Sequence, residues 1–89
     1  MLIFNQTSIY YLKRLASRAR TKYSQKFRLT NEKDVIELLL FSSSSHDIET
    51  KRDFMLFYIN CSDHVRDYLS REFSISAPMK NMVMMKQAV

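Results

Sequence analysis

The chain of 89 residues contains no glycine and only one proline. Glycine supplies the positive φ angles of tight hairpin turns and the close backbone approach of phosphate-cradling and dinucleotide-binding loops. Such loops cannot be built here in their usual form, which excludes the common nucleotide-binding enzyme classes. An all-helical chain with serine-rich joints suits this constraint best. Its helices are expected to end through Asn, Ser or Lys side chains rather than at a left-handed glycine.

Apolar residues recur at helical spacing over residues 8–28, which are predicted to form the first helix. Thr7 or Ser8 is the expected N-cap, and basic residues near the other end suit the negative pole of the helix dipole. The predicted buried face of this helix holds Ile9, Leu12, Leu15, Ala16, Ala19, Tyr23 and Phe27.

A second helix is predicted over residues 32–42, with Thr30 or Asn31 as its N-cap. It is apolar on most sides, so we expect it to be the most buried element. The alternative is a buried strand over residues 35–41 that pairs with residues 53–60, but consecutive leucines favour a helix. The four serines at 42–45 are predicted to form a joint, after which Ser44 and Asp47 resemble a capping box.

Helical spacing resumes at residue 48 and continues to residue 73, where two helices are predicted over residues 47–60 and 62–74. Ser62 or Asp63 would make a good new N-cap at the break between them. The predicted apolar stripe holds Phe54, Phe57, Tyr58, Cys61, Val65, Tyr68 and Leu69. The opposite, polar side holds Asp53, Asn60, His64, Asp67 and Arg71.

The sequence therefore predicts one all-α domain over residues 1–75, a small bundle of three to four helices, followed by a Met-rich C-terminal tail over residues 76–89. Pro78 suits the first turn of a short docking helix in this tail. The third helical region is apolar around more than half of its circumference, and so short a chain has little with which to cover it. We therefore expect a homodimer whose interface includes Met55, Phe57, Ile59, Met79 and Met82.

Positive charge is concentrated at the start of the chain. Residues 1–28 carry seven Lys or Arg and no Asp or Glu, whereas residues 29–89 carry seven basic and nine acidic residues. The net charges of these two parts are +7 and −2. The candidate residues for contact with a polyanion or an acidic partner are Lys13, Arg14, Arg18, Arg20 and Lys22.

Several uses of this basic face stay open. It can contact nucleic acid phosphates while Tyr10 or Tyr11 stacks on an unpaired base. It can also be solvated, face an acidic partner protein, or pair with acidic residues of the same chain, namely Asp47, Glu49, Asp53 and Asp63. The charges spread around the polar side of the helix instead of forming a narrow stripe, which favours these uses over nucleic acid binding. Membrane binding is not expected.

No catalytic, metal or cofactor site is predicted. Cys61, His64 and Asp67 follow one another at three-residue steps, but Cys61 belongs to the apolar stripe and His64 to the polar side. A buried free thiol beside an exposed histidine is the favoured interpretation. The only other histidine, His46, is distant in sequence, so a metal site of three or four ligands is not expected. The predicted function is that of a non-enzymatic regulatory or adaptor module in a reducing, cytoplasmic setting.

Overall fold

Four helices make up the part of the chain that the computed structural model describes, residues 2–73, and no strand occurs there. They are α1 (Gln6–Tyr23), α2 (Glu32–Ser43), α3 (Ile48–Asn60) and α4 (Asp63–Glu72). The all-α prediction is confirmed, and the strand alternative for residues 35–41 is wrong because α2 takes up this segment. The predicted tail helix, with Pro78, Met79 and Met82, lies outside the described residues.

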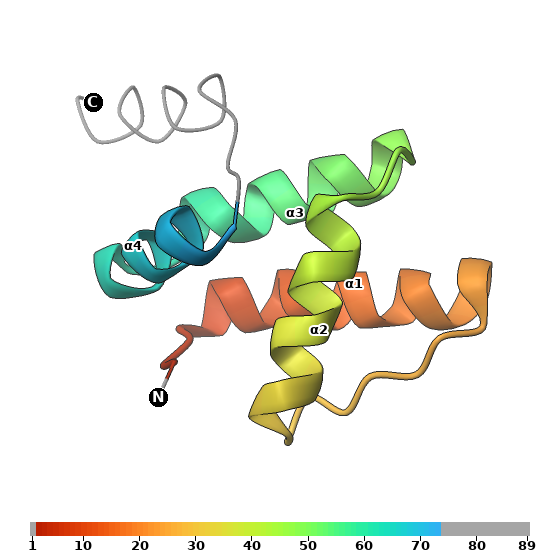
Figure 1. Cartoon of the computed structure of the whole chain (residues 1–89), viewed down its shortest axis with the longest axis horizontal. Helices are drawn as coiled ribbons and strands as arrows, with labels where there is room; N and C mark the ends of the chain where they lie inside the picture. Colours follow the sequence, from red (N-terminus) through yellow and green to blue (C-terminus); the bar gives the residue numbers. More distant parts are fainter. Residues whose placement is uncertain (1, 74–89) are drawn as a thin grey trace.

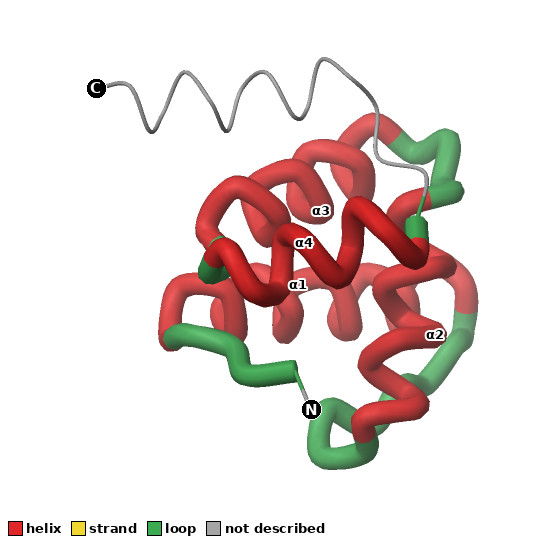
Figure 2. The backbone as a smooth tube through the Cα atoms, turned by 60° about the vertical axis from the view of Figure 1, so that its left-hand side comes forward, coloured by secondary structure: helices red, strands yellow, loops and turns green. Residues whose placement is uncertain are grey.

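Helices α1 and α3 lie side by side and run in opposite directions, and α2 crosses in front of them (Figure 1). Short loops connect the helices, except for the longer segment between α1 and α2 (Figure 2). The predicted break after Asn60 is confirmed, since α3 ends there and α4 begins at Asp63. Ser62 occupies the N-cap position of α4, although its side chain makes no capping hydrogen bond.

The first helix begins earlier and ends earlier than predicted. Asn5, not Thr7 or Ser8, is its N-cap, and the Asn5 side-chain oxygen accepts a hydrogen bond of 2.8 Å from the Ser8 amide. The helix stops at Tyr23 because Ser24 adopts the left-handed conformation, with φ of 55°. The Gln25 amide then donates to the Ala19 carbonyl at 3.0 Å, which satisfies the free end of the helix. The expectation that a residue such as serine would stand at the helix end in place of glycine holds here, but Ser24 itself adopts the left-handed conformation that glycine usually takes.

The starts of α2 and α3 lie within one residue of those predicted, but only the predicted cap of α2 is confirmed. Asn31 caps α2 by accepting hydrogen bonds from the amides of Lys33 and Asp34. The proposed capping box of Ser44 and Asp47 is wrong because Asp47 is itself the N-cap of α3. Its carboxylate accepts from the Thr50 amide at 3.0 Å and from the Thr50 hydroxyl at 2.7 Å.

One side of each helix contributes to a single core. The predicted apolar stripe of α3 and α4 is buried in full except for Tyr68, which is half-buried. On α1, Ile9 and Tyr23 are more exposed than predicted. The buried apolar residues of the described chain are Leu12, Leu15, Ala19, Val35, Leu38, Leu39, Phe54, Phe57, Tyr58, Cys61, Val65, Leu69 and Phe73.

The second helix is less enclosed than predicted. It packs against both α1 and α3, but its Leu40 is 47% exposed. Phe57 of α3 is 0% exposed and packs against the rings of Phe4 and Phe54. Phe57 therefore belongs to the core, and its predicted place in a dimer interface is wrong, because neighbouring parts of the same chain cover it.

The left-handed Ser24 gives a test of how α1 ends. A residue with a side chain is strained in this conformation, and glycine is not. We expect Ser24→Gly to raise the free energy of unfolding by about 1 kcal/mol. The same change in the middle of α1, Ser17→Gly, should instead lower it by about 0.5 kcal/mol. Urea denaturation followed by circular dichroism measures both, and equal signs for the two variants would contradict this account of the terminus.

Candidate functional site

Three of the five candidate basic residues face acidic side chains of α3. Arg14, Arg18 and Lys22 are spaced four residues apart, so they lie along one side of α1. The antiparallel arrangement places carboxylates of α3 opposite them in reverse order. We call this set the ion-pair ladder; it consists of Arg14, Arg18, Lys22, Asp47, Glu49 and Asp53.

The distances in the ion-pair ladder are those of direct contacts. Arg14 Nε lies 3.3 Å from one carboxylate oxygen of Asp53, and Arg18 Nε lies 2.5 Å from the other. Arg18 also reaches Glu49 through Nη1 at 2.6 Å. Lys22 Nζ lies 2.9 Å from Asp47 and 3.7 Å from Glu49. The interpretation that the basic face pairs with acidic residues of its own chain is thus confirmed for these three carboxylates.

Asp53 lies at the centre of the ion-pair ladder and is only 2% exposed. The sequence analysis placed it on the outer, polar side of its helix, which is wrong. Its burial is tolerated because each of its two oxygens receives a hydrogen bond from an arginine of α1. Asp63, also considered as a partner of the basic face, pairs with Arg66 of its own helix instead.

The contacts of the ion-pair ladder shift the pKa values of several of its members. The hydrogen bond from Lys22, followed by that from Thr50, lowers the pKa of Asp47 to about 2. The same contact raises the pKa of Lys22. Hydrogen bonding to Asp53 raises the pKa of Arg18 in the same way. Both partners are therefore held in their charged forms across the physiological pH range.

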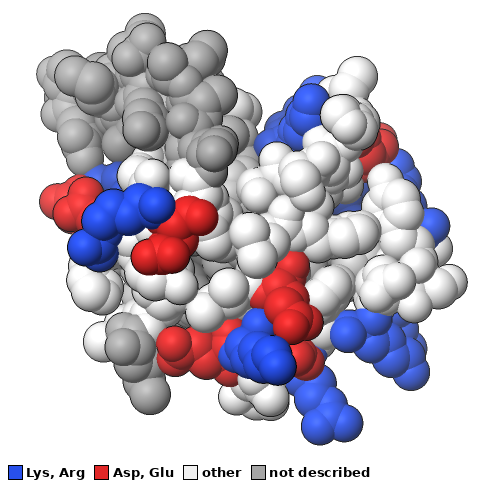
Figure 3. Space-filling view, in the orientation of Figure 1, with Lys and Arg blue, Asp and Glu red and all other residues white. Residues whose placement is uncertain are grey.

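The remaining basic residues of the first 28 make no ion pair with the described part of the chain. They are Lys13, Arg20, Lys26 and Arg28, all exposed. Figure 3 shows Lys and Arg side chains gathered at the lower right, over the segment that follows α1. Of the predicted site residues, the structure thus separates Lys13 and Arg20 from Arg14, Arg18 and Lys22.

Three of these free cations surround a groove of about 640 Å³, which we call the basic groove. Arg20 comes from α1, and Lys26 and Arg28 come from the segment between α1 and α2. The rest of the wall is mostly apolar, with one hydroxyl and one acidic side chain. It is formed by Ala16, Ser17, Phe27, Leu29 and Asp34.

The segment from Ser24 to Asn31 holds its position through contacts with α2. The ring of Phe27 packs against Phe41, with 5.9 Å between ring centroids. The Arg28 amide donates a hydrogen bond of 2.9 Å to the Asp34 carboxylate, in the first turn of α2. The sequence analysis missed the basic groove because it extended the first helix through residue 28, which spreads Lys26 and Arg28 around a helical axis. No glycine marks the earlier end of the helix, which lies at Ser24.

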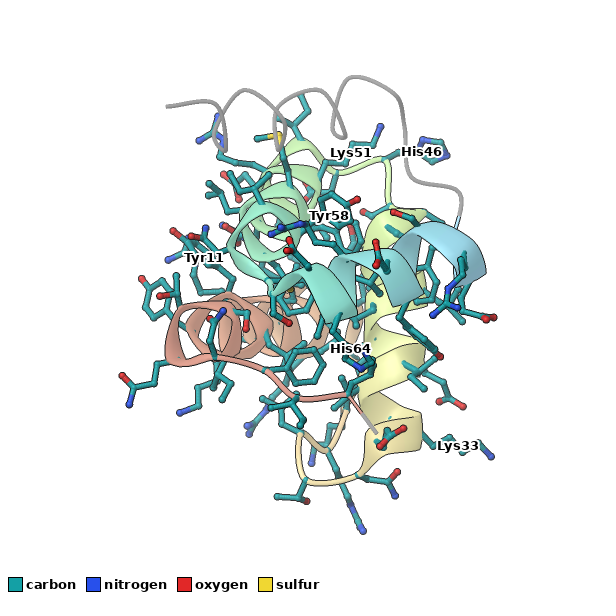
Figure 4. The ribbon with its side chains drawn as sticks, turned by 90° about the vertical axis from the view of Figure 1, so that its left-hand side faces the viewer. Tyr11, Lys33, His46, Lys51, Tyr58 and His64 are labelled. Carbon is teal, nitrogen blue, oxygen red and sulfur yellow. The ribbon has the colours of Figure 1, made fainter. Side chains whose placement is uncertain are left out.

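The Cys61 thiol is buried and donates a hydrogen bond of 3.1 Å to the Phe57 carbonyl. Burial raises the pKa of Cys61 to about 12, so the thiol is protonated near neutral pH. His64 is exposed, as predicted, and lies well apart from His46 (Figure 4). Within residues 2–73, no group of three His, Cys, Asp or Glu side chains is arranged to hold a metal ion.

Comparisons of this chain with protein-family models, curated proteins and solved structures found no match. Within the described residues, none of the helices combines the length and the hydropathy that a membrane span requires. The chemistry of the site must therefore be read from the chain's own residues.

The buried carboxylate of Asp53 should carry much of the stability of the helix pair. In Asp53→Asn, Arg14 and Arg18 would face each other without a compensating charge. Breaking a fully buried pair costs roughly 3–5 kcal/mol, and the water-accessible arginines reduce this to about 2 kcal/mol here. The matched change on the exposed side of α4, Asp67→Asn, should alter stability by less than about 0.5 kcal/mol. Equal denaturation midpoints for the two variants would contradict this role of Asp53.

Asp47 should make stability depend on acid pH. Its folded pKa of about 2 lies below the ordinary value of 3.8, so its ion pair stabilises the fold above pH 3.8 and loses this effect as the pH falls through about 2. Asp47→Asn removes the charge but keeps an N-cap acceptor, whereas Asp47→Ala removes both. Urea denaturation over a pH series should show the deficit of Asp47→Asn shrinking in acid, while part of the deficit of Asp47→Ala persists. A deficit of Asp47→Asn that does not change with pH would refute the pKa argument.

Proposed function

We propose that this chain is a small non-enzymatic regulatory or adaptor module that acts by binding another protein at the basic end of α1. The observation that carries the proposal is the division of the basic residues into two groups. Arg14, Arg18 and Lys22 are neutralised within the chain, and the free cations Arg20, Lys26 and Arg28 surround a groove with an apolar wall. Protein interfaces combine apolar and charged contacts in this way.

The same division weakens the alternative of nucleic acid binding through the first helix. Three of the residues suited to phosphates, Arg14, Arg18 and Lys22, are occupied by carboxylates. Tyr10 is 55% exposed, but it lies toward the start of α1, next to Tyr11 and under Arg14, and it does not line the basic groove. Free cations and exposed aromatic rings are therefore not combined as a base-stacking platform needs.

A non-enzymatic role is supported by the state of Cys61, because a protonated, buried thiol is a poor nucleophile. A single cysteine also suits the reducing, cytoplasmic setting that we propose. Because Cys61 is the one thiol from which a nucleophile could be made, its protonated state favours a binding role over a catalytic one.

Salt titration with duplex DNA separates the two candidate partners. At most four cations of the first 28 residues are free, which limits the log–log slope of affinity against salt to about −3.6, at about −0.9 per phosphate contact. Fluorescence anisotropy should show weak binding within this limit, and Lys13→Gln, which removes one of the four free cations, should lower the slope by no more than about 0.9. A slope near about −6 that falls towards about −3.6 when Arg14, Arg18 and Lys22 are replaced by Gln would mean that the ladder cations also bind phosphates, and would overturn the proposal in favour of nucleic acid.

Self-association remains part of the proposal, with a smaller surface than the sequence suggested. Met55 and Ile59 are half-buried on α3, whereas Phe57 is not available. We expect a dimer in sedimentation equilibrium at micromolar concentration, and its dissociation in Met55→Asp because a charge would be buried at the interface. A monomer at every concentration would refute self-association without affecting the basic groove.

A further inference from the structure

We infer that the basic groove takes a short acidic peptide segment in which two adjacent apolar side chains are flanked by Asp or Glu residues. This inference rests on the proposed function, because it names the partner chemistry of the same end of α1. It follows from three properties of the groove: its charge, its apolar wall and its fixed shape.

The charge of the basic groove favours carboxylates. Arg20, Lys26 and Arg28 contribute three positive charges, and Asp34 contributes one negative charge, so the wall has a net charge of +2. One oxygen of the Asp34 carboxylate already accepts a hydrogen bond from the Arg28 amide. Guanidinium groups bind carboxylates through paired hydrogen bonds, so Arg20 and Arg28 can each hold an acidic side chain of the peptide.

The apolar wall favours a peptide over an isolated anion or a nucleic acid backbone. Ala16, Phe27 and Leu29 are half-buried, so part of each remains open to the groove. A phosphate group would use the cations and leave this apolar surface in water. An aliphatic or aromatic side chain of a partner would cover it, and a volume of about 640 Å³ suits a few side chains rather than a folded domain.

The fixed shape of the basic groove lowers the entropic cost of binding. Ser24 directs the chain away from the axis of α1, Phe27 is fixed by its ring contact with Phe41, and the Arg28 amide is fixed by Asp34. The backbone that presents Lys26 and Arg28 is therefore ordered before any partner arrives. A preformed site loses less conformational freedom on binding than a flexible loop does.

Fluorescence anisotropy with labelled peptides tests the inference on the full chain. The first probe is an octapeptide of Asp and Glu with a central Leu-Phe pair, and the second carries two serines in place of that pair. We expect the wild type to bind the first probe at least about tenfold more tightly than the second, because two apolar side chains lose their contact surface. Equal affinities would overturn the inference, since they would show attraction between charges alone.

Charge reversal locates the site. Arg20→Glu combined with Lys26→Glu should weaken binding of the Leu-Phe probe by at least about tenfold, because the groove then repels acidic side chains. The control variant combines Lys13→Glu with Lys51→Glu, which makes the same change of net charge at exposed positions outside the groove. It should weaken binding of the probe by less than about threefold. Circular dichroism melts check that all variants fold.

Equal losses in the groove variant and the control variant would place the peptide elsewhere and overturn the inference. Absence of binding by the wild type would do the same. The DNA titration is independent of either result. A slope within the four-cation limit would mean that the proposed protein binding occurs at another surface, whereas a steep slope would overturn the proposed function itself.

Discussion

The contact between the buried carboxylate of Asp53 and two arginines of α1 is the interaction on which the rest of this structure depends. It joins the two longest helices of the described chain at their middle, and weaker contacts join them at both ends. At one end the Asn5 side chain donates to the Asn60 carbonyl at 2.8 Å, and at the other Lys22 pairs with Asp47. Because an uncompensated buried charge is costly, this set of contacts strongly disfavours other registers of the two helices.

The same interaction determines which charges are left for a partner. Four of the seven cations at the start of the chain are free of the ion-pair ladder, and three of these lie around the basic groove. The basic residues at the start of the chain therefore fall into two groups: those that pair with carboxylates of the same chain and those left to contact a partner. Net charge alone would have assigned all seven cations to contact with a polyanion. The pairing of α1 with α3 occupies three of them.

Much of the fold was predictable because it depends on local periodicity. The stripe from Phe54 to Leu69 and the break near Ser62 follow from helical spacing and capping preference, which are properties of neighbouring residues. The burial of Asp53 was not predictable in this way, because it depends on the antiparallel placement of α1. The four-residue spacing of Arg14, Arg18 and Lys22, with Glu49 and Asp53 spaced alike, is the one sequence signal that points to it.

The absence of glycine explains why the basic groove was the hardest part to predict. A glycine after Tyr23 would have indicated the end of α1, because glycine takes the left-handed conformation without strain. Serine gives no such signal, yet Ser24 adopts that conformation, since the helix must end there for Phe27 to reach Phe41 and for Asp34 to hold the Arg28 amide. The strain at Ser24 is therefore offset by tertiary contacts of the segment that follows. Those contacts also fix the positions of Lys26 and Arg28, so the departure from local preference and the candidate binding site have one cause.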